Sequence, residues 1–281
     1  MFKHNVLVKN TESFFLVLVI LLQLFSCNAN AHEMWIEPVK YQIEKDAMIF
    51  AHEKVGQNFK GNEYSYLDSS YEKIDITVNN ETHPIKSRIG DIPAIHVQAK
   101  KEGLTILSAV TTVSDISYET WAKFESFIKS KELDWVLIKH KKRGLPDKGF
   151  TEAYQRFPKA LVKVGAGAGK DKILGMRLEW LIETNPYTTP YKKDGVIKAR
   201  LLWEGKPLKF THVGVFNKLD NQLIKTSLST DENGVVNIPQ ANGGEFLINA
   251  VQMVEPSGKV RKETGAVWES LWASVTYKLN P

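Results

Sequence analysis

Short segments in which apolar and polar residues alternate recur along this chain, and polar turns separate them. Ile74–Val78 alternates cleanly and ends at Asn79–Asn80, a pair typical of hairpin turns. Residues 94–99 and 104–110 form a similar pair of segments around a polar turn. Short strands at regular spacing predict a mainly β fold built from β-sandwiches.

A proline-containing stretch divides the predicted strands into two groups. Asn185–Pro190 reads as a linker, and strand-like segments then follow one another from Val196 to the C-terminus. This second group is typical of an immunoglobulin-like or transthyretin-like sandwich. We therefore expect two β-sandwich domains, at residues 32–185 and 191–281.

The first predicted domain contains a helical insertion around residues 117–157. Within residues 118–131 the apolar side chains recur at spacings of three and four, as on one face of an amphipathic helix: Trp121, Phe124, Phe127 and Ile128. Ser117 precedes them as a candidate N-cap. We also expect short helices at 134–139 and at 152–157, the latter ended by Pro158.

The first 31 residues have the features of a secretory signal peptide. Lys3 and Lys9 precede an apolar run at residues 14–25, and Ala29-x-Ala31 fits the cleavage site. The run is shorter than the roughly 20 apolar residues that span a bilayer, so we expect no transmembrane helix in the mature chain. These features predict a periplasmic protein whose N-terminal residue is His32.

A second processing route competes with this one. The segment that ends at Cys27 resembles a lipoprotein cleavage box, in which Cys27 would carry the lipid and become the N-terminus. Because Cys27 is the only cysteine, the chain forms no internal disulfide and no cysteine-based metal site.

The charge pattern argues against a nucleic-acid-binding protein. The whole chain has a net charge of +5. The signal contributes Lys3, Lys9 and Glu12, so the mature chain carries +5 − 1 = +4. Its charges are interspersed, and no basic run is interleaved with stacking aromatic residues.

Seven segments, which together span almost the whole mature chain, resemble a bacterial periplasmic family of unknown function that is labelled NikM-like. They are residues 32–38 (HEMWIEP), 55–61 (VGQNFKG), 159–165 (KALVKVG), 174–179 (LGMRLE), 201–208 (LLWEGKPL), 230–234 (TDENG) and 268–277 (WESLWASVTY). The resemblance implies a two-part β-rich protein without catalytic residues. It also implies the periplasmic component of nickel or cobalt uptake, with a membrane transporter or an outer-membrane receptor as partner.

His32 and His52 are the candidate metal ligands. Cleavage after Ala31 would place a free α-amine and an imidazole on His32, and His52 follows a predicted strand at the same pole of the first domain. Three nitrogen ligands suit nickel, cobalt or copper. Of the other histidines, we expect a half-buried His96, a structural His212, and solvated His83 and His140.

Enzymatic motifs are absent from the sequence. No Gly-x-Ser-x-Gly elbow is present, and the glycine-rich segment 165–170 lacks the spacing of a phosphate-binding loop. We therefore expect a non-catalytic binding or accessory protein with a role in metal uptake. The alternative is a structural or envelope-interaction protein whose sandwiches bind a protein or glycan partner.

Overall fold

The computed structural model describes residues 32–192, 194–220, 222–240 and 243–280, and its strands form a central sheet with two outer sheets. The central sheet contains β2 (Gln42–Ile43), β5 (Tyr71–Val78), β6 (Glu81–Pro84), β8 (Gly103–Thr111), β9 (Ser114–Tyr118), β10 (Phe150–Val164), β14 (His212–Leu219), β15 (Gln222–Ser229), β17 (Gly244–Val254) and β18 (Trp268–Leu279). The first outer sheet contains β1 (Glu33–Pro38), β3 (Met48–Gln57), β4 (Lys60–Tyr64) and β7 (Ile95–Gln98). The second outer sheet contains β11 (Leu178–Ile182), β12 (Val196–Trp203), β13 (Lys206–Pro207) and β16 (Val235–Pro239). The predicted mainly β, sandwich-like fold is confirmed.

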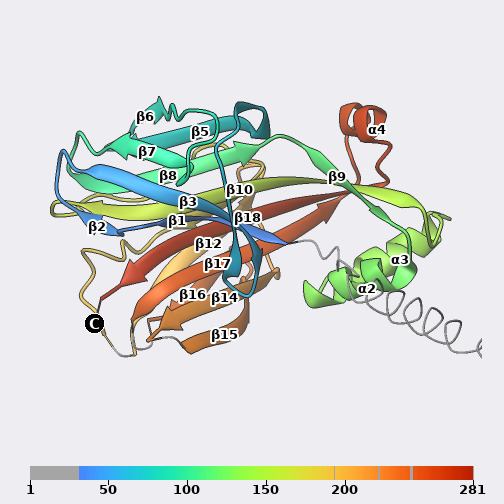
Figure 1. Cartoon of the computed structure of the whole chain (residues 1–281). Coiled ribbons are helices and arrows are strands. Elements are labelled where there is room, and N and C mark those ends of the chain that lie inside the picture. The colour runs from blue at the N-terminus through green and yellow to red at the C-terminus, as the bar shows by residue number, and fades with distance from the viewer. Residues whose placement is uncertain (1–31, 193, 221, 241–242, 281) are drawn as a thin grey trace, which may run out of the picture. The chain divides into compact units, whose positions relative to one another are not determined.

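The order of the central sheet is β15-β14-β17-β18-β10-β8-β5-β6, with β2 and β9 also paired to β10 (Figure 1). Alternate residues of a strand point to opposite faces. On β18, Leu271 and Val275 pack toward the second outer sheet in one apolar core. On β10, Ala160 and Val162 pack toward the first outer sheet in another. The central sheet is therefore covered on both faces.

Hydroxyl groups of β18 form hydrogen bonds that join the first outer sheet to the central one. Ser274 Oγ donates to the carbonyl oxygen of Met34 at 2.6 Å, and Thr276 Oγ1 donates to that of Ile36 at 2.6 Å. Both hydroxyls are buried, so each bond also removes the cost of an unpaired polar group. The segment that follows the predicted signal is thereby fixed across the last strand.

Strands from both predicted domains share sheets. β10 pairs with β18 in parallel, and β11 pairs with β12 across the predicted linker. Residues 32–281 form one compact unit. The linker itself is packed, because Asn185 Nδ2 donates to the carbonyl oxygen of Gly167 at 2.9 Å. The division at 185–191 stays a prediction.

Two helices lie together at one end of the sheets, next to β9 (Figure 1). They are α2 (Trp121–Ser130) and α3 (Asp134–Lys142), close to the predicted 118–131 and 134–139. The predicted N-cap Ser117 is wrong, since Ser117 lies in β9 and Thr120 occupies the N-cap. A further helix, α4 (Gly258–Thr264), was not expected. None of the helices in the described ranges is both long and apolar enough to cross a membrane.

The helix expected at 152–157 is wrong. Those residues belong to β10, which continues through Pro158 to Val164. On one side β10 pairs with β9 up to Tyr154 and with β8 from Leu161 onward. Pro158 lies in the gap between these two ladders, where a strand tolerates a residue without an N–H donor.

A buried lysine joins β10 to β11. Lys159, Asp171 and Glu179 are all buried, and the ammonium of Lys159 lies 2.9 Å from Asp171 Oδ1 and 3.3 Å from Glu179 Oε1. It also donates to the carbonyl oxygens of Lys172 and Trp180. Burying charges is costly unless they are paired and hydrogen-bonded, and here every member has partners.

The two carboxylates also hold the chain between β10 and β11. Glu179 accepts hydrogen bonds from the backbone N–H groups of Leu174, Gly175 and Met176 at 2.7, 3.0 and 3.1 Å. Asp171 accepts one from the N–H of Ile182 at 2.7 Å. The segment 171–176, which has no regular secondary structure, is thereby fixed above the central sheet.

Replacement of the buried lysine tests the importance of this network. We expect Lys159→Met to lower the free energy of unfolding by about 3–5 kcal/mol, because two buried carboxylates lose their counterion. Urea denaturation measures the change. The control Lys163→Met alters a half-buried lysine of the same strand and should cost less than about 1 kcal/mol. Equal losses in the two variants would contradict this role.

Candidate functional site

The structure places the two predicted metal ligands apart. β1 and β3 are antiparallel, with Glu37 opposite His52 and Glu33 opposite Gly56. At about 3.4 Å per residue, the four steps from Glu33 to Glu37 span roughly 14 Å, and His32 lies one residue further. His32 is half-buried, and its carbonyl oxygen accepts a hydrogen bond from Arg156 at 3.3 Å. The register does not bring the two imidazoles together.

The surroundings of His52 already contain a cation. His52 Nδ1 lies 3.3 Å from Glu63, while the ammonium of Lys54 lies 2.6 Å from Glu37 and 3.7 Å from Glu63. Burial alone raises the pKa of Glu37, but hydrogen bonds from Lys54 and Trp35 outweigh it and keep that pKa below its ordinary value. Lys54 therefore occupies the space between the carboxylates that a metal would need. No three potential ligands are grouped as a metal site anywhere in the described ranges.

Of the remaining histidines, His140 was mispredicted. It is fully buried on α3, where Trp268 Nε1 donates to His140 Nδ1 at 3.0 Å and His140 Nε2 donates to the carbonyl oxygen of Pro146 at 3.0 Å. Burial lowers its pKa, which favours the neutral ring that these two bonds require. His83 is exposed and His96 is half-buried, as predicted.

A buried carboxyl group lies next to His52 in β3. Glu53 points away from solvent and accepts a hydrogen bond from the hydroxyl of Tyr71. Burial raises the pKa of Glu53 to about 8, although the positive charge of Arg156 opposes the shift. This group supports packing between the first outer sheet and β5, and it faces none of the cavities described below.

A concave site lies on the central sheet, beside the second outer sheet. Its cavity has a volume of about 300 Å³. The floor is made by β5, β6 and β8, where Asp75 lies directly opposite Ser108 and Lys73 opposite Val110. Thr82 of β6 completes it. We call this site the lysine groove.

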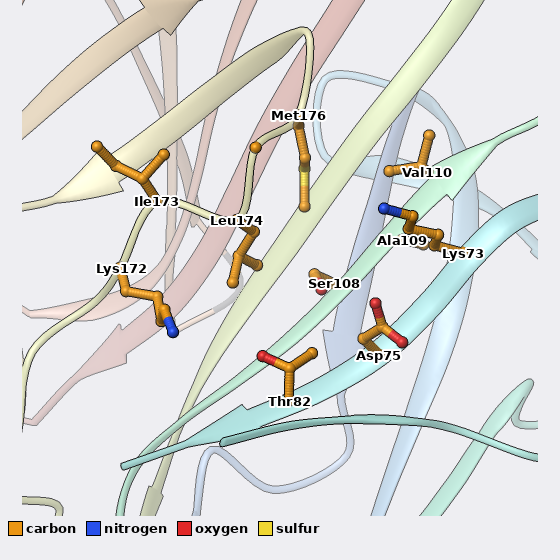
Figure 2. A pocket seen from close by; sticks show the side chains of 11 residues that line it. Lys73, Asp75, Thr82, Ser108, Ala109, Val110, Lys172, Ile173, Leu174 and Met176 are labelled. Atoms are coloured by element: carbon orange, nitrogen blue, oxygen red, sulfur yellow. The ribbon is translucent and has the colours of Figure 1, made fainter. Parts of the chain in front are cut away.

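Residues 172–176 form the opposite wall of the lysine groove. Figure 2 shows Lys172, Leu174 and Met176 pointing toward the side chains of β5, β6 and β8 across the cavity, whereas the side chain of Ile173 points the other way. The ammonium of Lys172 also lies 3.4 Å from the carbonyl oxygen of Asn80, and so reaches across to the β5–β6 turn. Because Glu179 holds the backbone of this wall, the groove is formed without a ligand.

The lysine groove has a positive balance of charge. Lys73 and Lys172 contribute two ammonium groups, and Asp75 contributes one carboxyl group. Burial raises the pKa of Asp75, and the charge of Lys73 opposes that shift. A second cavity of about 430 Å³ shares Lys172 and adds Lys170. Such a site suits a ligand with an acidic group and with hydroxyls that can bond Asp75 and Ser108.

Only a weak pattern in the sequence indicates this groove. Lys73 and Asp75 alternate with apolar residues in β5, which is equally typical of a solvent-exposed face. Lys172 follows the glycine-rich segment 165–170, which lacks the spacing of a phosphate-binding loop. Three distant segments meet here, and none of them contains a recognisable motif.

The sequence was compared with protein families and with curated proteins. A family model described as a domain of unknown function (DUF4198) matches residues 29–254. None of the curated proteins matches the sequence significantly. The description of the family assigns no ligand, so the nickel or cobalt uptake that the resemblance implies stays a prediction.

Metal titration of the processed protein tests the separation of the two histidines. Because roughly 14 Å or more divides them along the strands, we expect His52→Ala to leave the affinity for Ni²⁺ unchanged. Isothermal titration calorimetry measures it, with His83→Ala as a control on an exposed histidine. A loss of tenfold or more that is specific to His52→Ala would show that His52 is a ligand.

The raised pKa of Glu53 predicts a pH-dependent stability. The folded state holds this proton more tightly than the unfolded state, so stability falls as the pH rises from about 4.5 to about 8. We expect Glu53→Gln to reduce that fall, as measured by urea denaturation across this range. Glu63→Gln, which changes a more exposed carboxylate on the neighbouring strand, should leave it unaltered. An unchanged pH profile in Glu53→Gln would contradict the prediction.

Proposed function

We propose that this chain, which belongs to the DUF4198 family of domains of unknown function because the family model matches most of its residues, is an exported, non-catalytic binding protein. The lysine groove is the observation that carries the proposal. Export to the periplasm is supported by the signal-like residues 1–31.

The ligand that fits the groove best is a small hydroxylated acid, of which an acidic sugar residue is the simplest example. The volume of about 300 Å³ lies at the lower end of the range for small-molecule sites. Lys73 and Lys172 supply positive charge from opposite walls, while Asp75, Ser108 and Thr82 supply hydrogen-bonding groups between them. This arrangement favours the glycan-binding alternative over metal uptake.

Metal uptake remains the second candidate on the strength of the resemblance alone. Nickel or cobalt would be cargo passed to a membrane transporter or an outer-membrane receptor. The described residues do not fit a site built from His32 and His52, because the register separates them and Lys54 already lies between Glu37 and Glu63.

Calorimetric titration with glucuronate and with glucose tests the proposed ligand class. The two sugars differ in one acidic group, so we expect glucuronate to bind at least about tenfold more tightly at low salt. Lys73→Met and Lys172→Met should each weaken glucuronate binding and leave the affinity for glucose little changed. Raising the salt concentration should also weaken glucuronate binding, since part of the attraction is electrostatic.

Lys60→Met is the matched control, because it removes an exposed lysine of β4 that lies outside the groove. It should bind glucuronate as the unaltered protein does. Equal affinity for the two sugars would contradict the proposed acidic ligand. Glucuronate binding that survives both groove substitutions would place the site elsewhere.

A further inference from the structure

The edge strand β15 is exposed and regular. It forms one edge of the central sheet, and in the described part of the chain no strand pairs with its outer side (Figure 1). Leu223 and Ile224 are 37% and 45% exposed. Edge strands are usually protected by prolines, bulges, charges or short length, because their free backbone groups can pair with another strand. β15 contains eight residues, no proline and a single charge, on Lys225.

The register of β14 and β15 determines which backbone groups of β15 are free. Leu219 pairs with Gln222, and beyond the other end of the ladder the N–H of Thr230 donates to the carbonyl oxygen of Thr211, so the even-numbered residues of β15 bond to β14. Because the direction of the N–H groups alternates along a strand, those of Leu223, Lys225, Ser227 and Ser229 point to the outer side. These four residues present a free ladder of donors and acceptors.

We propose that β15 pairs with β15 of a second copy of this chain, antiparallel and about a two-fold axis at Thr226. This register places Lys225 opposite Ser227 and Leu223 opposite Ser229, so outward-facing residues meet outward-facing residues. A register centred on Lys225 would set two ammonium groups directly opposite each other, which is unfavourable. One centred on Ser227 would leave Leu223 without a partner.

Glu132 supplies charge complementarity for this register. Its carboxylate lies 3.3 Å from the hydroxyl of Ser227 and 3.0 Å from His212 Nδ1, on one face of the β14–β15 hairpin. Residues directly opposite each other in an antiparallel pair point to the same face. Lys225 of the second copy, opposite Ser227, therefore lies within reach of Glu132. The two-fold axis repeats this ion pair.

The pairing ends at two copies. An isologous contact uses the same edge of both chains and closes on itself. The opposite edge of the central sheet, β6, has four residues and ends at Pro84. A short edge with a proline is poorly suited to strand addition, so the paired sheets do not extend into a fibre.

A proline substitution tests the free ladder. Lys225→Pro removes an N–H that points outward and leaves the bonds to β14 in place, so this variant should fold and remain monomeric. Lys225→Ala removes the same side chain and keeps the N–H, and it should still dimerise, a few-fold more weakly. Light scattering coupled to size-exclusion chromatography across a concentration series measures both. Monomeric unaltered protein throughout the series would overturn the proposal, as would equal dimerisation of the Lys225→Pro variant.

Charge exchange and cross-linking test the register. Lys225→Glu should weaken dimerisation at least about tenfold, and adding Glu132→Lys should restore it. In a Cys27→Ser background, Thr226→Cys should form an intermolecular disulfide, because the two Thr226 residues meet at the axis. Ile224→Cys, which is displaced from the axis, should not. Failure of the charge exchange to restore dimerisation, or equal cross-linking of the two cysteine variants, would exclude this register.

Discussion

The ion pairs of the buried Lys159 ammonium are the interactions on which the rest of this structure depends. Lys159 lies in β10 and pairs with two carboxylates, one on the second outer sheet and one in the segment that precedes that sheet. Those carboxylates then hold the backbone at Leu174–Met176 and at Ile182. One charge network thus joins two sheets and shapes a wall of the lysine groove.

The local pattern of apolar residues predicted those strands and helices whose buried face depends on that pattern alone. The alternation in β5 and the three-four spacing in α2 came from the sequence directly, because each reflects one buried face, whereas β8 is buried on both faces. The errors arose where distant residues decide the outcome. Pro158 ends a helix in an isolated segment, but here it lies in a gap between two paired strands. His140 has basic neighbours in the sequence, yet aromatic residues surround it in the fold.

The stretch after the predicted signal has a structural role that its sequence does not reveal. Glu37 accepts hydrogen bonds from Trp35 Nε1 and from the ammonium of Lys54, and Glu33 forms an ion pair with Lys131 at 2.7 Å. These side chains hold β1 in place. The groove that we propose for a ligand lies on the other face of the central sheet. It depends on side chains from β5, β8 and the segment before β11, which are brought together only by the fold. A single sequence therefore pointed to the N-terminal residues and not to the groove.

The attachment of β1 to β18 has a consequence for how the chain acquires its structure. The hydroxyls of Ser274 and Thr276 donate hydrogen bonds to carbonyl oxygens of residues 240 positions earlier in the sequence. Contacts of such separation require closure of a very long loop and are associated with slow folding. The two bonds from β18 to β1 therefore form only after the last strand has been synthesised and placed, whereas β1 can already contact β10. In a chain that crosses a membrane N-terminus first, these two bonds would form only after the C-terminus has emerged.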